Sequence, residues 1–179
     1  SRWSIQIKMA ADRECLGALE LYGFDLIEGE SVDLNVEEGI KYLKKAVEKG
    51  SVESIYPLAM LFYKGEKVPV NKIEAFKYMK IGSDKNDLEC MYNCSLMLYN
   101  GEGTPIDKEE SIRLFKKAAD SGHKKAQQTY GDCLDRGDCV AKNLEEALLY
   151  YKMAADRGDS DSMLKYGAAY ISGTGVESR

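Results

Sequence analysis

Apolar side chains recur along this chain at the spacing of amphipathic helices. In residues 123–158 a first apolar face follows the spacing i, i+4, i+7 and i+8, and its members are Ala126, Tyr130, Cys133 and Leu134. After a polar break at residues 137–140, a second face runs as far as Gly158 and contains Leu144, Ala147, Leu148, Tyr151, Ala154 and Ala155. Two short helices of this kind cannot bury their apolar faces alone. The stretch therefore predicts a helical hairpin that packs against similar neighbours.

The hairpin pattern repeats with a period of about 36 residues through four units. Each predicted second helix opens on Asn or Asp and has a glutamate three residues later; these pairs are Asn35 and Glu38, Asn71 and Glu74, Asp107 and Glu110, and Asn143 and Glu146. We expect capping boxes, in which the opener's side-chain oxygen accepts one backbone N–H and the glutamate reaches back to another. The predicted single array, of about ten helices, has partial repeats at 1–13 and 159–179 and complete repeats at 14–50, 51–86, 87–122 and 123–158.

Three short motifs recur at fixed places in these units: an aromatic–glycine pair, a glycine-rich loop and a pair of alanines. They are Tyr130-Gly131, Tyr166-Gly167, Gly101-Glu102-Gly103-Thr104, Gly173-Thr174-Gly175-Val176, Lys117-Ala118-Ala119 and Met153-Ala154-Ala155. In this combination the chain resembles the Sel-1-like repeat family, which is related to the tetratricopeptide repeat. The resemblance implies an all-α, right-handed superhelical solenoid of helix-turn-helix repeats whose first helices line a concave groove. Pro57 and Gly82-Ser83 depart from the pattern, and we expect altered local geometry there.

Charge and composition narrow the class of partner. The 179-residue chain has a formal net charge of −5, so nucleic acid, which binds basic surfaces, is not an expected partner. No apolar run reaches the ~20 residues that span a bilayer, which argues against direct membrane insertion. The five cysteines form no recurring pair, so we expect free thiols and a cytoplasmic location. The endoplasmic reticulum lumen or the bacterial periplasm is the alternative if a signal peptide was removed.

Both ends of the array carry apolar side chains on faces that need a neighbour, among them Trp3 and Ile5 at one end and Leu164 and Tyr170 at the other. Terminal repeats of a solenoid normally present a polar outer face. We therefore expect the chain to be a piece of a longer protein. Self-association through the two end faces is the alternative.

The strongest functional candidate is a set of side chains on the predicted groove face of the first helices. The second and third complete repeats contribute aromatic and aliphatic side chains, and the fourth contributes polar ones. The residues are Tyr56, Met60, Tyr63, Tyr92, Leu96, Tyr99, Gln128 and Asp135. Further groove positions fall at Gly17, Glu20, Phe24, Ile27, Glu28, Glu53, Lys64, Glu89, Asn100, Lys125, Asp132 and Arg136. Tyr and Met suit adaptable recognition, so we predict a surface that binds a peptide or a partner protein. In the alternative, a structural spacer, these aromatic residues pack between adjacent first helices and Tyr63 and Tyr99 are buried.

Catalytic and metal-binding interpretations find little support. The single histidine, His123, falls in a polar position at a helix start, where we expect a capping or solvated role. Cys90 and Cys94 share a helix face, but a structural zinc site needs four converging ligands. Cys139 has no basic neighbour to activate its thiol. We predict a non-catalytic adaptor without metal or cofactor. A β-lactam-binding or hydrolysing enzyme, as the resemblance implies for some cysteine-rich relatives, and a spacer or regulatory array are the alternatives.

Overall fold

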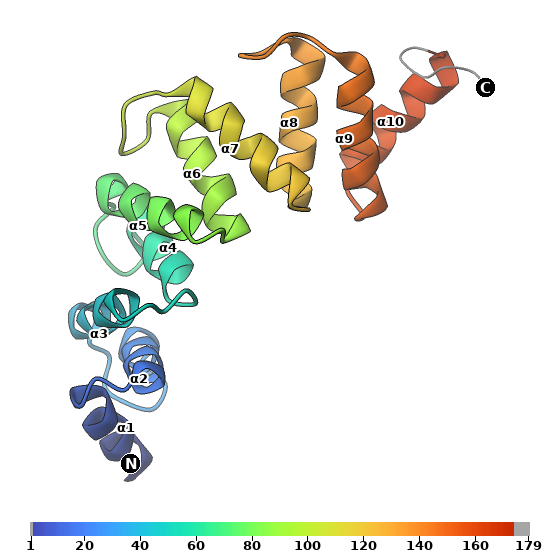
Figure 1. Ribbon diagram of the computed structural model, residues 1–179. Coiled ribbons are helices and arrows are strands. Elements are labelled where there is room, and N and C mark those ends of the chain that lie inside the picture. Colours follow the sequence, from blue (N-terminus) through green and yellow to red (C-terminus); the bar gives the residue numbers. More distant parts are fainter. Residues whose placement is uncertain (1, 174–179) are drawn as a thin grey trace. The chain divides into compact units, whose positions relative to one another are not determined.

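The computed structural model describes residues 2–173, which form helices and loops without a strand (Figure 1). The chain divides into two compact units, 1–85 and 86–179. The ten helices of the described residues are α1 Arg2–Asp12, α2 Leu16–Glu28, α3 Val36–Glu48, α4 Ile55–Lys64, α5 Lys72–Asp84, α6 Leu88–Asn100, α7 Lys108–Asp120, α8 Lys124–Arg136, α9 Leu144–Asp156 and α10 Ser160–Ser172. The all-α prediction is confirmed. The predicted loop residues 174–176 lie outside the described part of the chain.

Each hairpin pairs a first helix with the following second helix, and small residues let the two backbones approach closely. In the pair α2–α3, a Cβ atom added to Gly39 would lie 2.7 Å from the carbonyl oxygen of Gly23. In α6–α7, the Ser111 hydroxyl donates a hydrogen bond to the carbonyl oxygen of Ser95 at 2.7 Å. These pairs occupy equivalent positions in their repeats, so the two helices of a hairpin cross at the same repeat position in both.

The second helices are capped as the sequence predicts in one half of the capping box. The openers are the N-caps, and each side chain accepts a hydrogen bond from the backbone N–H of the glutamate at 3.0–3.1 Å. The prediction of a reciprocal hydrogen bond, from the opener's backbone N–H to the glutamate side chain, is wrong. The openers' own N–H groups instead donate to carbonyl oxygens of the preceding first helix at 2.9–3.0 Å, on Leu26, Phe62, Leu98 and Leu134. Those bonds fasten each inter-helix loop to the end of its first helix.

Replacing Asp107 by alanine should lower the free energy of unfolding by about 1 kcal/mol, because the amide of Glu110 would lose its cap. Asp107→Asn is the matched control, because asparagine caps the equivalent helices at Asn35, Asn71 and Asn143. Urea denaturation followed by circular dichroism measures both. Equal losses in the two variants would show that the carboxylate acts through its charge and not through the cap.

Pro57 changes the helix that contains it. Helix α4 has 10 residues, whereas the other first helices have 13, and it begins at Ile55. The Ser51 hydroxyl still accepts a hydrogen bond from the Ser54 amide at 3.1 Å, as an N-cap would, but the intervening residues form turns. Proline has no N–H and is tolerated only in a first turn, so the helix starts late. The helix around Gly82-Ser83 is continuous and both residues are buried, so the expected irregularity there is wrong.

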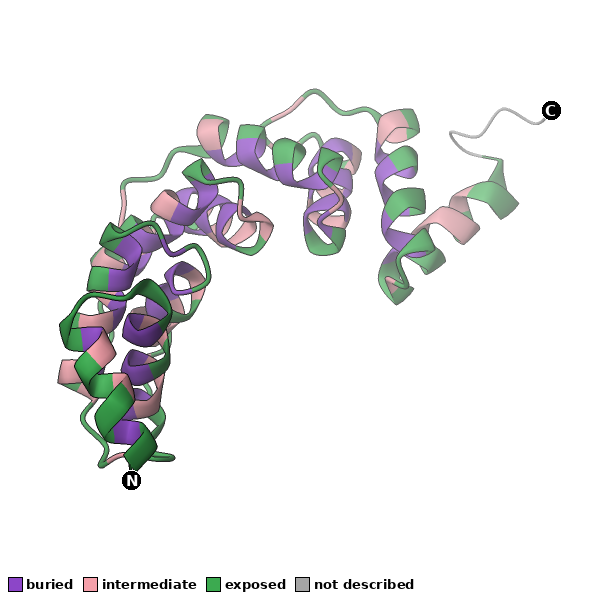
Figure 2. Ribbon diagram, turned by 60° about the horizontal axis from the view of Figure 1, so that its bottom comes forward, coloured by how far each residue is buried: buried purple, intermediate pink, exposed green. Residues whose placement is uncertain are grey.

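The core runs along the facing sides of paired helices. Tyr130, on the first apolar face predicted from the sequence, is buried, and so are the residues at the equivalent position of the other complete repeats, Tyr22, Leu58 and Cys94. In Figure 2, buried positions follow one side of most helices. Helix α10 differs, because Ser162 is its one buried residue among those described. The equivalent core residue Tyr166 is only half-buried there. A first helix without a paired second helix thus leaves its core face exposed.

Candidate protein-binding face

In the first of the two compact units, residues 1–85, the predicted groove residues Tyr56, Met60 and Tyr63 lie on α4 and are half-buried. The ammonium group of Lys72, at the start of α5, lies 4.2 Å from the centroid of the Tyr63 ring. This cation–π contact covers one face of the ring. Tyr63 is therefore neither fully buried nor fully open to a partner.

In the second unit, Tyr92, Leu96 and Tyr99 lie on α6 and are also half-buried. The Tyr92 ring stacks on His123 at a centroid distance of 4.8 Å, so this residue packs between the first helices α6 and α8. Tyr99 lies under Lys108, with 4.5 Å between the ammonium nitrogen and the ring centroid. The aromatic residues of the predicted face thus make intramolecular contacts as well as lining the surface.

The hydroxyl of Tyr99 donates a hydrogen bond to the carboxylate of Asp138 in the loop after α8. This bond raises the pKa of Tyr99 to about 12 and lowers the pKa of Asp138. Of the two predicted polar residues on α8, Gln128 donates to Asp161 at 3.4 Å, and Asp135 is half-buried. The eight predicted residues divide between the two compact units, three on α4 and five on α6 and α8.

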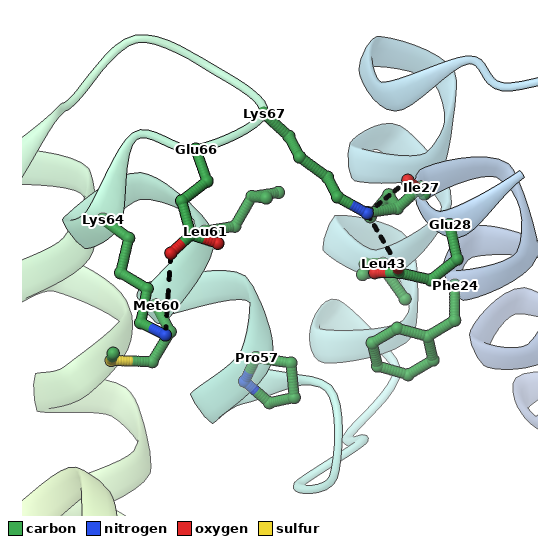
Figure 3. Close-up of a pocket in the computed structure, with 10 residues that line it drawn as sticks. All are labelled: Phe24, Ile27, Glu28, Leu43, Pro57, Met60, Leu61, Lys64, Glu66 and Lys67. Carbon is green, nitrogen blue, oxygen red and sulfur yellow. Dashed lines mark hydrogen bonds and ion pairs between the residues drawn. The ribbon is translucent and has the colours of Figure 1, made fainter.

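A pocket of about 190 Å³ opens between the first helices α2 and α4 of the first unit (Figure 3). Its apolar lining consists of Phe24, Ile27, Leu43, Pro57, Met60 and Leu61. Four charged side chains complete it: Glu28, Lys64, Glu66 and Lys67. Five of these ten residues belong to the groove positions predicted from the sequence, so the pocket lies on the predicted face.

The charged side chains around this pocket differ in how strongly they are engaged by other groups of the protein. The ammonium group of Lys67 binds a carboxylate oxygen of Glu28 at 2.6 Å and the carbonyl oxygen of Ile27 at 2.9 Å. Lys67 therefore ties the loop after α4 to the end of α2, as the dashed lines in Figure 3 show. Lys64 and Glu66 are 3.9 Å apart, and their side chains are 54% and 71% exposed. An exposed pair at that distance contributes little to stability.

A second pocket, of about 250 Å³, lies between the first helices α6 and α8 of the second unit. It is lined by Leu96, Tyr99, Asn100, Phe115, Thr129, Asp132, Cys133, Arg136 and Asp138. Every one of these positions lies two repeats after a lining position of the first pocket; Leu96 corresponds to Phe24 and Arg136 to Lys64. The two units therefore contain the same pocket with different side chains.

Both acidic residues of the second pocket are engaged within their own unit. Asp132 accepts hydrogen bonds from the Tyr151 hydroxyl, at 2.6 Å, and from the ammonium group of Lys165. Asp138 accepts from Tyr99 and from the thiol of Cys139. In the described part of the chain, no hydrogen bond or ion pair engages the exposed side chain of Arg136.

His123 caps α8, as one of its two expected roles requires, but it is not solvated. Its Nδ1 accepts a hydrogen bond from the Ala126 amide at 3.1 Å, and the side chain is 7% exposed. Since Nδ1 is an acceptor, the ring proton of neutral His123 is on Nε2, which lies 3.2 Å from a carboxylate oxygen of Glu89. The side chain of His123 therefore joins α8 to α6, and of the two roles expected for it the capping role is the one observed.

All five cysteines are free, and three of them, Cys90, Cys133 and Cys139, are poor nucleophiles because their pKa values are raised. Burial raises the pKa of Cys90, and it raises that of Cys133 to about 11. Cys139 is exposed, but its hydrogen bond to Asp138 raises its pKa as well. Among residues 2–173, no three His, Cys, Asp or Glu side chains gather as metal ligands. Within the same residues, no helix combines the length and apolar character needed to cross a membrane.

Sequence reasoning missed the residues that close the two pockets, chiefly Pro57, Leu61, Thr129 and Lys67. The predicted groove positions follow one helix face, whereas a pocket needs walls from two helices and a loop. The repeat itself carried a signal, because equivalent positions of consecutive first helices line the same pocket, such as Phe24 with Met60 and Leu96 with Asp132.

The model of the Sel1 repeat matches residues 16–51, 52–87, 88–123, 124–159 and 160–178. The crystal structure of a protective antigen present in uropathogenic Escherichia coli strains, displaying an SLR fold, superposes with a TM-score of 0.86 at 28% identity, over 97% of this chain and 37% of that one. A Sel1 repeat protein from Oxalobacter formigenes gives 0.76 at 25% identity, over 92% and 67%. Helicobacter pylori cysteine-rich protein B gives 0.52 at 22% identity, over 69% and 93%, and is alike in fold alone.

The chain thus spans little more than a third of the length of the Escherichia coli antigen that it resembles. Among curated proteins, no sequence matches the chain. The matched repeat boundaries follow the 36-residue period seen in the sequence.

Proposed function

Because the chain belongs to the Sel1 repeat family, whose members are generally protein-interaction scaffolds, we propose that it is a non-catalytic adaptor that binds a partner protein along the face of its first helices. The observation that carries this proposal is the pair of equivalent pockets, which open between consecutive first helices in both units. Their linings combine apolar side chains with charged ones, as protein interfaces do. The partner engages this face with an exposed segment.

The alternatives fit less well. An enzyme of the β-lactam-hydrolysing type needs a nucleophile with an adjacent base, and the pKa values of the thiols of Cys90, Cys133 and Cys139 are raised. The family is typically non-catalytic. A pure spacer predicts that Tyr63 and Tyr99 are buried between helices, whereas both are half-buried. The proposed compartment is the cytoplasm, where free thiols are stable.

Lysine substitutions on the first-helix face should remove the partner. We expect Met60→Lys combined with Leu96→Lys to lower recovery of a specific partner from cell extract by at least about tenfold, because a charged side chain replaces apolar contact area in each pocket. The matched control is Ile73→Lys combined with Leu149→Lys. These two residues lie on second helices and are 72% and 63% exposed.

Quantitative mass spectrometry of proteins captured by wild type, face variant and control variant measures the effect, after circular dichroism has shown that all three are folded. A partner lost from the face variant and kept by the control supports the adaptor. A partner lost from the control alone would place binding on the second helices and contradict the proposal.

A further inference from the structure

We infer that the two equivalent pockets are sockets for one kind of partner segment: an extended stretch in which a bulky apolar residue stands next to aspartate or glutamate. This inference rests on the proposed function and specifies the chemistry of its partner. The apolar side chain enters the pocket, and the neighbouring carboxylate pairs with Lys64 in the first unit or with Arg136 in the second.

The size of the pockets favours a single side chain. Their volumes, about 190 and 250 Å³, lie below the ~300–1,000 Å³ typical of sites for small-molecule ligands. Each is open on the first-helix face and has an apolar wall on one first helix: Phe24 with Ile27 on α2, and Leu96 with Tyr99 on α6. A leucine-sized or methionine-sized side chain would bury its surface there without a change of backbone.

The charge that remains available in each pocket is positive. In the first, Lys67 and Glu28 neutralise each other at 2.6 Å, while Lys64 has only an exposed partner at 3.9 Å. The residue equivalent to that partner, Asp138, is already engaged in the second pocket. There Arg136 has no hydrogen bond or ion pair among the described residues, and its guanidinium suits a bidentate carboxylate.

Helix termini alone do not explain these two cations. A basic residue in a last turn stabilises a helix through the macrodipole, and that benefit would apply equally to every first helix. Helices α2 and α6, which form the opposite walls, have no basic residue in the last turn and carry Glu28 and Asn100 at the equivalent position. The cation therefore recurs on one wall of each pocket.

The test is a titration of the uniformly ¹⁵N-labelled chain with three synthetic peptides, followed by amide chemical shifts. Each peptide is acetylated and amidated, and consists of glycine and serine around one central dipeptide: Leu-Glu, Leu-Gln or Ala-Glu. We expect the Leu-Glu peptide to shift the amides near Met60 and Lys64, and those near Asp132 and Arg136. It should bind about three- to fivefold more tightly than either control peptide, the gain of one exposed ion pair or one small apolar contact.

Charge reversal separates the two pockets. Lys64→Glu should abolish the preference for Leu-Glu over Leu-Gln at the first pocket and leave the second unchanged, and Arg136→Glu should do the opposite. Lys85→Glu and Lys142→Glu, exposed lysines outside both linings, are the matched controls and should alter neither. The spectra of the free variants show directly that each one is folded.

Equal affinity for Leu-Glu and Leu-Gln, with shifts on the first helices, would overturn the inference and leave the adaptor standing. So would a preference that survives both charge reversals. Absence of shifts at both pockets at millimolar peptide would also overturn the inference, while the capture experiment with whole partners judges the adaptor separately. Shifts confined to the second helices would contradict both.

Discussion

Replacing Gly131 by alanine should lower the free energy of unfolding by about 2 kcal/mol, although alanine is the better helix former. A Cβ atom at this position would lie 2.8 and 2.9 Å from two ring carbons of Tyr151, closer than such atoms approach in proteins. The ring cannot retreat, because it is 2% exposed and its hydroxyl is bonded to Asp132. Overpacking costs about 1–3 kcal/mol, and a locked ring puts the loss at the upper end. The higher helix propensity of alanine offsets about 1 kcal/mol of this destabilisation.

The repeat provides an internal control for this prediction. Gly167 is the equivalent glycine one repeat later, and a Cβ added there meets no atom within 4 Å, because α10 has no paired second helix in the described residues. Gly167→Ala should therefore raise stability by up to about 1 kcal/mol. Urea denaturation measures both variants. Destabilisation of similar size at both positions would mean that the aromatic–glycine pair acts through the backbone and not through packing against the second helix.

Sequence patterning predicted the local parts of this fold because the signals are local. An N-cap and its glutamate lie three residues apart, and the helix faces repeat within two turns, so spacing alone located them. The second half of each capping box was predicted wrongly for a non-local reason. The opener's N–H finds a carbonyl oxygen nine residues back, on the first helix, as with Asn35 and Leu26. Pairing across a loop depends on how two helices meet, which residue spacing does not encode.

The candidate face shows the same division. Its residues were found from the repeat, but their contacts come from elements more than 30 residues away, as with Tyr92 against His123 and Tyr99 against Asp138. Burial of His123 was missed for this reason, since its position beside a helix start suggested exposure. The pockets are still harder to predict from the sequence, because the volume of a pocket depends on the size of the side chains on both of its walls. Pro57 shortens α4 and also lines the first pocket, so one substitution in a repeat affects both the helix and the pocket.

Raising the pH from 10 to 12 should unfold the protein, because buried tyrosines resist ionisation in the folded state. Burial, with nearby carboxylates, raises the pKa of Tyr78 in the first unit to about 12. In the second unit, burial and the hydrogen bond to Asp120 raise that of Tyr150 to about 12. An unfolded tyrosine has a pKa of about 10, so the stabilisation is complete below pH 10 and is lost as the pH rises towards 12. Each group then forfeits about 2–3 kcal/mol, a large part of a typical domain's stability.

The chain has twelve tyrosines, so the ionisation of Tyr78 is followed as the difference in tyrosinate absorbance between the wild type and a Tyr78→Phe variant. That difference and the far-ultraviolet circular dichroism of the wild type, recorded on the same samples, should change together between pH 10 and 12. Tyr78→Phe is the informative variant, because its ring keeps the stacking on Phe62, at a centroid distance of 6.2 Å, and no longer has a group to ionise. It should leave stability at neutral pH nearly unchanged and move the loss of helix to higher pH. Tyr150→Phe would be ambiguous, since it also removes hydrogen bonds to Asp120 and Lys116. Ionisation of Tyr78 near pH 10 with the helices intact would show that its ring is open to water, and that the packing of α4 against α5 is looser than the geometry indicates.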